Sequence, residues 1–346
     1  MLQDLLSGLS TPLLLGAFAA AALVVTLVSI RATHLADTIA DRTGFGEAMV
    51  GAVVLGAATS LSGVVVSVTV AMQGDASFAV SNAVGGIAAQ TVFLAFGDMI
   101  YRRANLEHAA AEPASLFQAV MLMILLSLPL CAFAGPEVAF LGIHPVSVVM
   151  FLVYLAGLKA AAQVAEQPMW RPVQTPETRD EADDETDDRR PLPVILGVFG
   201  GLVVLMALSG YAISQLGQVF VPRFGLASGL VGSLLTAVVT SLPELVTTLT
   251  AIRHGALQLA VGGLIGGNTF DTLFLVASDA AYREGSIYHA AGVTDLYWLG
   301  TGLLMTAILL AGLLMRQKDG PGGIGVESVA LVAVYAVAVG LQVMAS

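Results

Sequence analysis

Residues 240–244 read Thr-Ser-Leu-Pro-Glu and lie in the middle of an otherwise apolar run from Leu234 to Ile252. A run of that length can cross the hydrocarbon core of a membrane as a helix. Because a carboxylate inside a membrane span is costly, Glu244 is by default a functional residue. Pro243 has no N–H to donate to the carbonyl of Val239, so the motif predicts a kinked helix with backbone oxygens free beside the carboxylate.

A second motif follows on the next apolar run, where residues 266–271 read Gly-Gly-Asn-Thr-Phe-Asp. Asp271 adds a second carboxylate and Asn268 a carboxamide, while Thr240 stands four residues before Glu244 on the same helix face. Carboxylate, amide, hydroxyl and carbonyl oxygens are the ligands of hard cations such as Ca²⁺. The alternative is that the two acids are buried structural carboxylates paired with neighbouring serine or threonine.

The composition agrees with a membrane protein. Of 346 residues, 57% are hydrophobic and only 11% charged, against about 25% charged in an ordinary soluble domain, which excludes a water-soluble globular enzyme. We expect the first apolar run to be a true span and not a cleaved signal, because its flank holds Asp4 and no lysine or arginine. The sequence predicts an all-α integral membrane protein with about ten crossings, near residues 12–30, 48–72, 79–101, 115–135, 145–163, 193–219, 227–252, 258–280, 293–315 and 324–345.

An internal repeat relates the two halves at a fixed offset of 181 residues, without a gap over residues 42–110. The rarer residue types match across it: Arg42 with Arg223, Thr59-Ser60-Leu61 with Thr240-Ser241-Leu242, Gly85-Gly86 with Gly266-Gly267, Asp98 with Asp279, Tyr101-Arg102 with Tyr282-Arg283, and His108 with His289. Since each half holds about five crossings, an odd number, the second half must enter the bilayer from the opposite side. We therefore expect two inverted five-helix repeats, residues 1–163 and 193–346, joined by a linker at 164–192. Inverted repeats are typical of secondary transporters with a binding site near the midplane.

The charges predict an orientation. With ten crossings, 12 of the 14 lysines and arginines fall on one side and only Arg223 and Arg283 on the other, which places both termini outside. The linker is then cytoplasmic; its nine acidic and four basic residues between Glu166 and Arg190 predict a disordered tether. No basic patch suggests nucleic acid as a partner. The single cysteine, Cys131, excludes an internal disulfide, and we expect it to be buried.

Two further pairs of charges stand four residues apart near helix ends, Asp98 with Arg102 and Asp279 with Arg283. We favour an ion pair at the membrane surface for each, with a role in gating or ion entry as the alternative. His108 and His289 are expected in loops beyond these helices and outside the site.

The two motifs of the second half resemble the α-repeat of the calcium:cation antiporter superfamily, the sodium/calcium exchangers and their relatives. That family carries a TSLPE-like motif and, on the next helix, a GSN-x-F-(N/D)-like motif. The resemblance extends to ten crossings in inverted halves with a cytoplasmic linker between spans five and six. It implies that Glu244 and Asp271 are acidic ligands, with Thr240 a backbone or hydroxyl ligand.

The first half departs from this pattern. Ser62 and Gly63 stand opposite Pro243 and Glu244, and Gln90 stands opposite Asp271. Moreover, Ile87 replaces the asparagine, and Gly86 and Gly267 occupy positions where the family often has serine. The site is therefore lopsided and poorer by one negative charge, which predicts weaker binding of divalent ions or an altered stoichiometry. Gln90 still offers a carbonyl oxygen and Thr59 a hydroxyl or backbone oxygen, and Gly63 permits the helix to unwind without proline.

We expect a secondary active antiporter that exchanges Ca²⁺ for a monovalent cation, Na⁺ or H⁺, by alternating access at a site formed by Glu244, Asp271, Thr240, Thr59, Gln90 and Asn268. Its partners are inorganic cations and the bilayer, and no cofactor is expected. The alternative is a divergent homologue without transport that acts as a membrane binding or regulatory protein. A channel is disfavoured because no repeated carbonyl filter is present. An enzyme is disfavoured because zinc and nucleophile motifs are absent.

Overall fold

The structure, a computed structural model, describes residues 2–43, 49–101, 104–110, 112–175, 178, 190–320 and 323–345. Within these residues the regular elements are helices, apart from one isolated bridge between Phe140 and Ile143. The all-α prediction is confirmed.

The helices of the first half are α1 (Leu2–Ser7), α2 (Thr11–Thr43), α3 (Met49–Met72), α4 (Ala76–Ile100), α5 (Leu106–Ala110), α6 (Pro113–Ala134) and α7 (Pro145–Glu166). Those of the second half are α8 (Leu192–Phe224), α9 (Ser228–Leu230), the π-helical turn η1 (Val231–Thr236), α10 (Ala237–Thr240), α11 (Leu242–His254), α12 (Leu257–Asp271), α13 (Leu273–Ala281), α14 (Ile287–Ala290), α15 (Val293–Met315) and α16 (Val326–Ala345).

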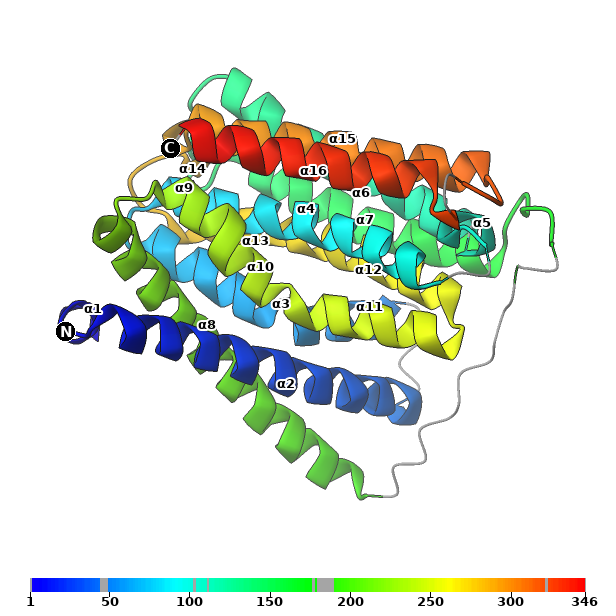
Figure 1. Cartoon of the computed structure of the whole chain (residues 1–346), viewed down its shortest axis with the longest axis horizontal. Helices are drawn as coiled ribbons and strands as arrows, with labels where there is room; N and C mark the ends of the chain where they lie inside the picture. The colour runs from blue at the N-terminus through cyan, green and yellow to red at the C-terminus, as the bar shows by residue number, and fades with distance from the viewer. Residues whose placement is uncertain are drawn as a thin grey trace.

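The repeat extends beyond the stretch that the sequence revealed. Both ends of α8 lie 181 residues after the ends of α2, and the short helices α5 and α14 begin at the same offset. In Figure 1, α2 and α8 run in opposite directions, the two chain termini lie at one end of the bundle, and the end of α7 and the start of α8, which flank the linker, lie at the other. The halves are therefore inverted, as predicted.

The number of crossings agrees with the prediction of about ten. Among the described residues, eight helices are long and apolar enough to span a membrane, and the bent pair Ser228–Thr240 and Leu242–His254 makes a ninth. A shorter apolar helix, Thr59–Met72, belongs to α3.

The predicted kink at Pro243 is confirmed, since the helix axis turns by 43° between Thr240 and Leu242. Gly63 would permit the equivalent helix to unwind, but α3 runs without a break through that position. The physical difference is that Ser62, which stands opposite Pro243, keeps the N–H that proline lacks, so α3 retains its backbone hydrogen bonds.

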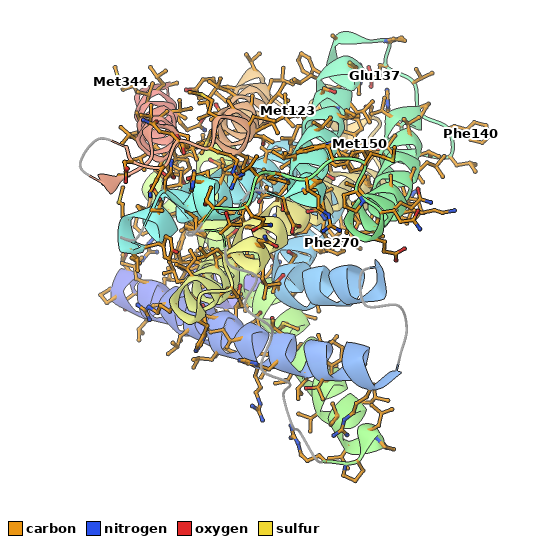
Figure 2. The ribbon with its side chains drawn as sticks, turned by 90° about the vertical axis from the view of Figure 1, so that its right-hand side faces the viewer. Met123, Glu137, Phe140, Met150, Phe270 and Met344 are labelled. Carbon is orange, nitrogen blue, oxygen red and sulfur yellow. The ribbon has the colours of Figure 1, made fainter. Side chains whose placement is uncertain are left out.

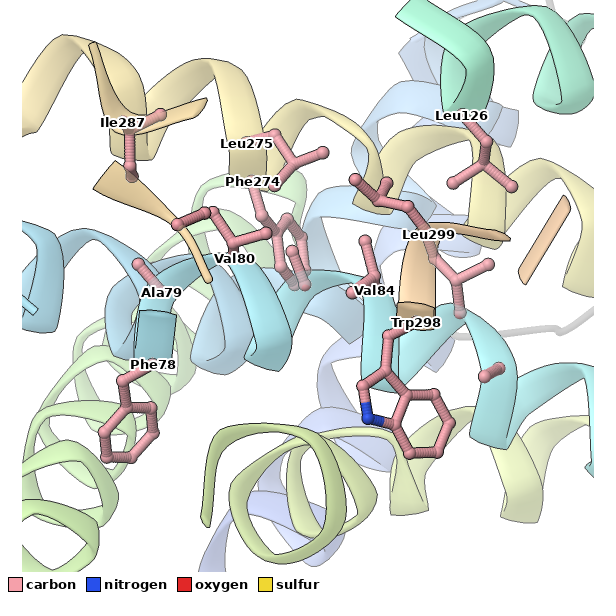
Figure 3. Packing of buried hydrophobic residues seen from close by; sticks show 14 of the residues in the cluster. Phe78, Ala79, Val80, Val84, Leu126, Phe274, Leu275, Ile287, Trp298 and Leu299 are labelled. Atoms are coloured by element: carbon pink, nitrogen blue, oxygen red, sulfur yellow. The ribbon is translucent and has the colours of Figure 1, made fainter. Parts of the chain in front are cut away.

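The centre of the bundle is α4, whose span is 83% buried, against 17% for α8 and 22% for α7 and α16. Figure 3 shows Phe78 and Val84 of α4 and Trp298 of α15 among the packed residues of the apolar core. The outer helices expose apolar side chains: Met344 is 84% exposed and lies at the periphery of Figure 2. Such an apolar face suits contact with lipid chains, which offer polar groups no hydrogen-bond partners. Cys131 also lies exposed on α6 and is not buried as expected, because an apolar residue in a membrane helix can face lipid instead of the core.

The two repeat-related aspartates are hydrogen-bonded inside the bundle. Asp279 is fully buried and accepts hydrogen bonds from the backbone N–H groups of His144 (2.7 Å) and Ile287 (3.4 Å) and from the hydroxyl of Ser147 (2.7 Å). The predicted ion pair with Arg283 is wrong, since the arginine is exposed and the carboxylate points inward.

Asp98 repeats this arrangement at the opposite end of the bundle. It accepts hydrogen bonds from the backbone N–H groups of Leu106 (2.8 Å) and Gly325 (2.7 Å), which lie 181 residues before Ile287 and after His144, respectively. Its predicted partner Arg102 lies outside the described residues. Each aspartate thus joins the end of one span to the following short helix and to the start of the last span of the other repeat.

The short helices α5 and α14 contain the two histidines that were expected in loops. His108 binds the carbonyl of Arg316 through Nδ1 (2.6 Å) and the hydroxyl of Thr175 through Nε2 (3.1 Å). Arg316 in turn donates to the carbonyl of Val173 (2.7 Å) and to the hydroxyl of Thr178 (3.2 Å). The start of the linker is therefore held against α5 and α15. The linker residues 176–177 and 179–189 lie outside the described residues.

Three buried acids, Asp98, Glu107 and Glu327, lie close together next to His108. Glu107 is fully buried, and neither of its carboxylate oxygens has a hydrogen-bond partner among the described residues. Asp98 and Glu327 are near enough to act on it, and Glu327 accepts a hydrogen bond from Asn105. Burial raises the pKa of Glu107 well above its ordinary value, and the negative charges of Asp98 and Glu327 raise it further. The folded protein therefore favours a protonated Glu107.

We expect Glu107→Gln to stabilise the protein increasingly as the pH rises. A glutamate whose pKa is raised in the folded state contributes its full stability to the fold below the ordinary glutamate pKa of about 4.3. That contribution is lost as the pH rises above this value. Glutamine stays neutral, so the variant's advantage grows by up to about 1.4 kcal/mol per pH unit until the raised pKa is passed. Thermal unfolding in detergent from pH 5 to pH 8 measures it, with Glu284→Gln, an exposed acid, as control. An advantage that does not change with pH contradicts the assignment.

Candidate cation site

The bend at Thr240 and the end of α12 bring the two predicted acids together. Glu244 lies in the first turn of α11 and is 5% exposed, and Asp271 ends α12 and is 1% exposed. The two carboxylates are near enough to interact electrostatically. Each lies near the middle of its span, so both are far from the bulk water at either end of the bundle.

The amides of Gln90 and Asn268 are almost fully buried, and that of Gln90 contacts Asp271. Gln90, on α4, donates through Nε2 to Oδ2 of Asp271 (2.6 Å) and to the hydroxyl of Ser241 (3.2 Å). Asn268 donates through Nδ2 to the hydroxyl of Thr91 (3.1 Å). The amide donors are thus engaged, which leaves their oxygens as the groups available to a ligand.

Four buried oxygens at this place have no hydrogen-bond partner in the described structure: Oε2 of Glu244, Oδ1 of Asp271, Oε1 of Gln90 and Oδ1 of Asn268. All four are acceptors only. Because a buried acceptor without a partner costs about 1–3 kcal/mol, a positively charged ligand or a proton would satisfy what the protein leaves open.

Hydroxyl groups complete the surroundings. Ser60 donates to Oε1 of Glu244 (3.3 Å) and lies beside Asp271 as well, and the hydroxyl of Thr59 is near Glu244. The hydroxyl of Thr240 donates to the carbonyls of Thr236 (3.0 Å) and Ala237 (3.2 Å), so only its oxygen remains for another partner. The structure therefore brings Thr59, Ser60, Gln90 and the two acids to one place, with Thr240 four residues before Glu244 and Asn268 on the same helix as Asp271.

Ser60 and Ser241 were not singled out from the sequence, although both belong to the Thr-Ser-Leu triplet that the two halves share. The repetition of a Thr-Ser pair inside two apolar spans is the sequence feature that could have indicated both serines. Ser60 contacts the acids of the other half, and Ser241 contacts Gln90 of the first half. Each serine thus links the repeats.

The glycines of the second motif and of its counterpart lie against the same side chains. A Cβ atom on Gly86 would stand 3.3 Å from the hydroxyl of Ser241 and 4.0 Å from Oδ2 of Asp271, and one on Gly267 would stand 3.7 Å from Oε1 of Gln90. A Cβ atom at either position would therefore touch the site residues at or near ordinary contact distance, and only the hydroxyl of Ser241 would have to give way slightly.

The arrangement supplies two formal negative charges and a set of neutral oxygens. No three histidine, cysteine or acidic residues of the described chain come together as a metal site. A cation held here has oxygen ligands only, at most two of its ligand groups are charged, and the remainder are amides, hydroxyls or backbone carbonyls. That ligand set suits Ca²⁺, Na⁺ or protons and not a thiolate- or imidazole-preferring metal.

Comparison with known proteins identifies relatives of both halves. The model of the family described as sodium/calcium exchanger protein matches residues 13–160 and 193–344. The inner membrane protein YrbG of Escherichia coli (strain K12) is 29% identical over 136 residues, which are 39% of this chain and 41% of that protein. The putative antiporter CaxA of Alkalimonas amylolytica is 36% identical over 121 residues, 35% of either chain. The chain thus spans less than half the length of these curated relatives in the matched regions.

Solved structures share the fold at low sequence identity. The H⁺/Ca²⁺ exchanger CAX superposes with a TM-score of 0.67 at 14% identity, covering 96% of this chain and 86% of that one. The sodium-calcium exchanger NCX_Mj superposes with a TM-score of 0.59 at 15% identity, covering 96% and 99%. These likenesses show the shared fold, and the family match over both repeats shows that the chain belongs to the sodium/calcium exchanger family of membrane transporters, which are not enzymes.

Proposed function

We propose that the protein exchanges Ca²⁺ for a monovalent cation, Na⁺ or H⁺, at the site of Glu244 and Asp271. The observation that carries the proposal is the set of four buried acceptor oxygens without partners, two of them on carboxylates of adjacent helices. Two carboxylates neutralise one Ca²⁺, which prefers six to eight oxygen ligands. Thr240, Thr59, Gln90 and Asn268 would supply neutral oxygens, with further places taken by backbone carbonyls or water.

Competition for the same carboxylates couples the two fluxes. An empty site with two buried negative charges is unfavourable in the bilayer, so the protein crosses between its outward- and inward-open states with the charges neutralised. Ca²⁺ neutralises them in one direction and monovalent cations in the other. Alternating access would come from one bundle of helices that shifts against the rest around the site.

A flux measurement tests this function. The purified protein is reconstituted in vesicles, and Ca²⁺ uptake is measured against an imposed Na⁺ gradient and, separately, an imposed pH gradient. We expect one of the two to drive uptake. Uptake that ignores both gradients would remove exchange. If calorimetry also shows no Ca²⁺ binding, the alternative of a binding or regulatory homologue without transport, which the glycine at position 63 motivates, is favoured.

We also propose that both termini face the outside and that the linker 164–192 is cytoplasmic. The two basic residues that we expect outside lie at the end of the bundle where the chain termini are. Arg223 donates to the carbonyl of Leu9 (3.1 Å), and Arg283 lies beside Gly142, in the loop between α6 and α7. Arg42, at the other end, donates to the carbonyl of Arg190 (2.6 Å). Protease added to inverted vesicles should cut the linker, and protease added to right-side-out vesicles should spare it; the reverse result overturns the orientation.

A further inference from the structure

The two ends of the bundle are built on the same plan, with α14 at the end of the chain termini and α5 at the other end (Figure 1). In α14, the buried hydroxyl of Tyr288 makes a hydrogen bond with the hydroxyl of Ser147 (2.7 Å). The repeat places Glu107, on α5, opposite Tyr288, and Glu327, at the start of α16, opposite Val146. The junction itself therefore does not require an acid at either position.

The rest of the junction is the same at both ends. The two repeat-related aspartates accept hydrogen bonds from equivalent backbone N–H groups. His289 binds the carbonyl of Gly135 through Nε2 (3.1 Å), and His108 binds the carbonyl of Arg316, at the equivalent position, through Nδ1 (2.6 Å). Glu107 and Glu327 are thus additions to a junction that forms without them at the other end.

Glu107 and Glu327 face each other without a donor between them. Both oxygens of the fully buried Glu107 lack a hydrogen-bond partner among the described residues, and Asp98 adds a third acid nearby. Ionised carboxylates only accept, so no hydrogen bond can join two of them. One proton on Glu107 removes a buried charge and supplies a donor to Glu327. Since no three acids or histidines of the described chain are placed to hold a metal ion, a proton is the ligand that fits.

The charges that act on Glu107 come from two elements. Burial raises the pKa of Glu107 most, and the negative charges of Asp98, on α4, and Glu327, on α16, raise it further. The helix α12, which also packs on α5, carries no charged side chain before Asp271. The other charged or titratable side chains next to α5 in the described structure are Tyr101, His108, Glu112, Arg316 and Lys318. In that part of the chain, Glu107 has no positive partner.

The same short helix holds the start of the linker. His108 follows Glu107 directly, and its Nε2 binds the hydroxyl of Thr175 (3.1 Å). Its carbonyl accepts hydrogen bonds from Nε (3.3 Å) and Nη2 (3.0 Å) of Arg316, whose Nη1 donates to the carbonyl of Val173 (2.7 Å). Because these contacts converge on one residue of a five-residue helix, a displacement of α5 breaks them together.

We infer that Glu107 and Glu327 form a proton-binding site, separate from the cation site, that controls the docking of the linker. With the proton bound, Glu107 donates to Glu327, α5 keeps its place, and the segment of Val173 and Thr175 stays docked. Without the proton, the carboxylates of Asp98, Glu107 and Glu327 repel one another, α5 moves and the linker is released. This control goes beyond the proposed exchange function and does not depend on it.

Hydrogen–deuterium exchange of the α5 amides, measured by mass spectrometry in detergent from pH 5 to pH 8, is the first test. At each pH the unaltered protein is compared with Glu107→Gln, which stays neutral, so the intrinsic pH dependence of exchange cancels. Since the pKa of Glu107 is raised in the docked state, the ratio of the two exchange rates should increase by up to about tenfold per pH unit above the ordinary value of about 4.3, until the raised pKa is passed. A ratio that stays constant overturns the inference.

Trp170 reports on the linker, because it lies five residues before Thr175 and is 54% exposed, whereas the second tryptophan, Trp298, is fully buried in the core. The fluorescence anisotropy of the unaltered protein should fall as the pH rises, and that of Glu107→Gln should stay at its low-pH value. The matched control is Glu166→Gln, an exposed acid at the end of α7, which should behave as the unaltered protein. An equal fall in Glu107→Gln separates the linker from the site and overturns the inference.

Infrared spectroscopy detects the proton itself, since a protonated carboxyl group has a C=O stretching band that a carboxylate lacks. The spectrum of the unaltered protein at pH 5, minus that of Glu107→Gln, should contain one such band; its absence shows an ionised Glu107 and overturns the inference. If Glu107→Gln does not fold, Glu327→Gln replaces it and keeps an acceptor oxygen for Asn105. It removes one charge that raises the pKa of Glu107, so the fall in anisotropy should shrink, and an unchanged fall overturns the inference.

Discussion

Replacing Glu244 by glutamine should abolish exchange, with Ca²⁺ uptake in vesicles falling on the order of 100-fold. Losing one member of a buried set of charges costs about 2–5 kcal/mol, and each 1.4 kcal/mol is tenfold in affinity. Asp271→Asn should have a similar effect, because it removes the other charge and places an amide N–H₂ beside Gln90, which already donates to this residue. Both replacements keep the volume of the side chain, so the loss reports charge and not packing.

A stability measurement separates loss of binding from loss of folding. Ca²⁺ should raise the thermal unfolding temperature of the unaltered protein in detergent, since a ligand that binds only the folded state stabilises it. The two variants should unfold at the same or a higher temperature than the unaltered protein without Ca²⁺, because they bury one charge fewer, and should lose the shift that Ca²⁺ produces. Glu137→Gln, an exposed acid in the loop between α6 and α7 (Figure 2), is the control and should behave as the unaltered protein. Full uptake by both Glu244→Gln and Asp271→Asn would show that the cation binds elsewhere.

The repeat was visible in the sequence because membrane spans tolerate few polar residues, so the shared Thr-Ser-Leu triplets and paired aspartates stand out against the apolar background. The same reasoning located both acids, since a carboxylate in a 19-residue apolar run needs a function to be tolerated. It also predicted the bend at Pro243, which follows from the covalent structure of proline alone. These features are local, and local chemistry is enough to predict them.

Contacts between the halves could not be predicted in this way. The position of Gly63 signalled a missing glutamate, but nothing in the sequence indicated that Phe274, 211 residues away, lies in its place. Asp98 and Asp279 were interpreted as surface ion pairs because an arginine follows each by four residues. Asp279 instead binds the hydroxyl of Ser147 and two backbone N–H groups, and the described partners of Asp98 are also backbone N–H groups, which every sequence offers at every position except proline. Hydropathy also gave no way to tell which faces of the spans meet lipid, as Cys131 shows.

The two halves therefore share an architecture and differ in chemistry. Helix ends, short helices and buried aspartates repeat at one offset, whereas the bend and the acids of the central site belong to the second half alone. A scaffold of this kind tolerates divergence at the centre because the aspartates at its two ends fix the positions of the spans independently of the ligand.

Asp279→Ala should destabilise the fold more than any exposed substitution. The replacement leaves two buried backbone donors without an acceptor, the N–H groups of His144 and Ile287, and it removes one of the two partners of the Ser147 hydroxyl, which keeps its hydrogen bond with Tyr288. At about 1–3 kcal/mol for each unsatisfied group, the loss is several kcal/mol and comparable to the whole stability of many domains. We expect little folded protein after extraction in detergent and a large fall in unfolding temperature for what remains. Asp279→Asn keeps one acceptor oxygen, so its unfolding temperature should lie between those of Asp279→Ala and the unaltered protein.

The repeat supplies a second measurement of the same effect. Asp98→Ala removes the acceptor for Leu106 and Gly325 at the other end of the bundle and should destabilise by a similar amount. Since the two sites share none of these partners, the asparagine replacements at both positions should add in one chain. Ca²⁺ affinity of the folded fraction should stay within about twofold of the unaltered value, because neither aspartate contacts the central acids. An Asp279→Ala protein that unfolds at the unaltered temperature would show that these hydrogen bonds do not hold the repeats together. A selective loss of Ca²⁺ binding at full stability would instead place the aspartate in the ion path and favour the alternative role in gating or ion entry.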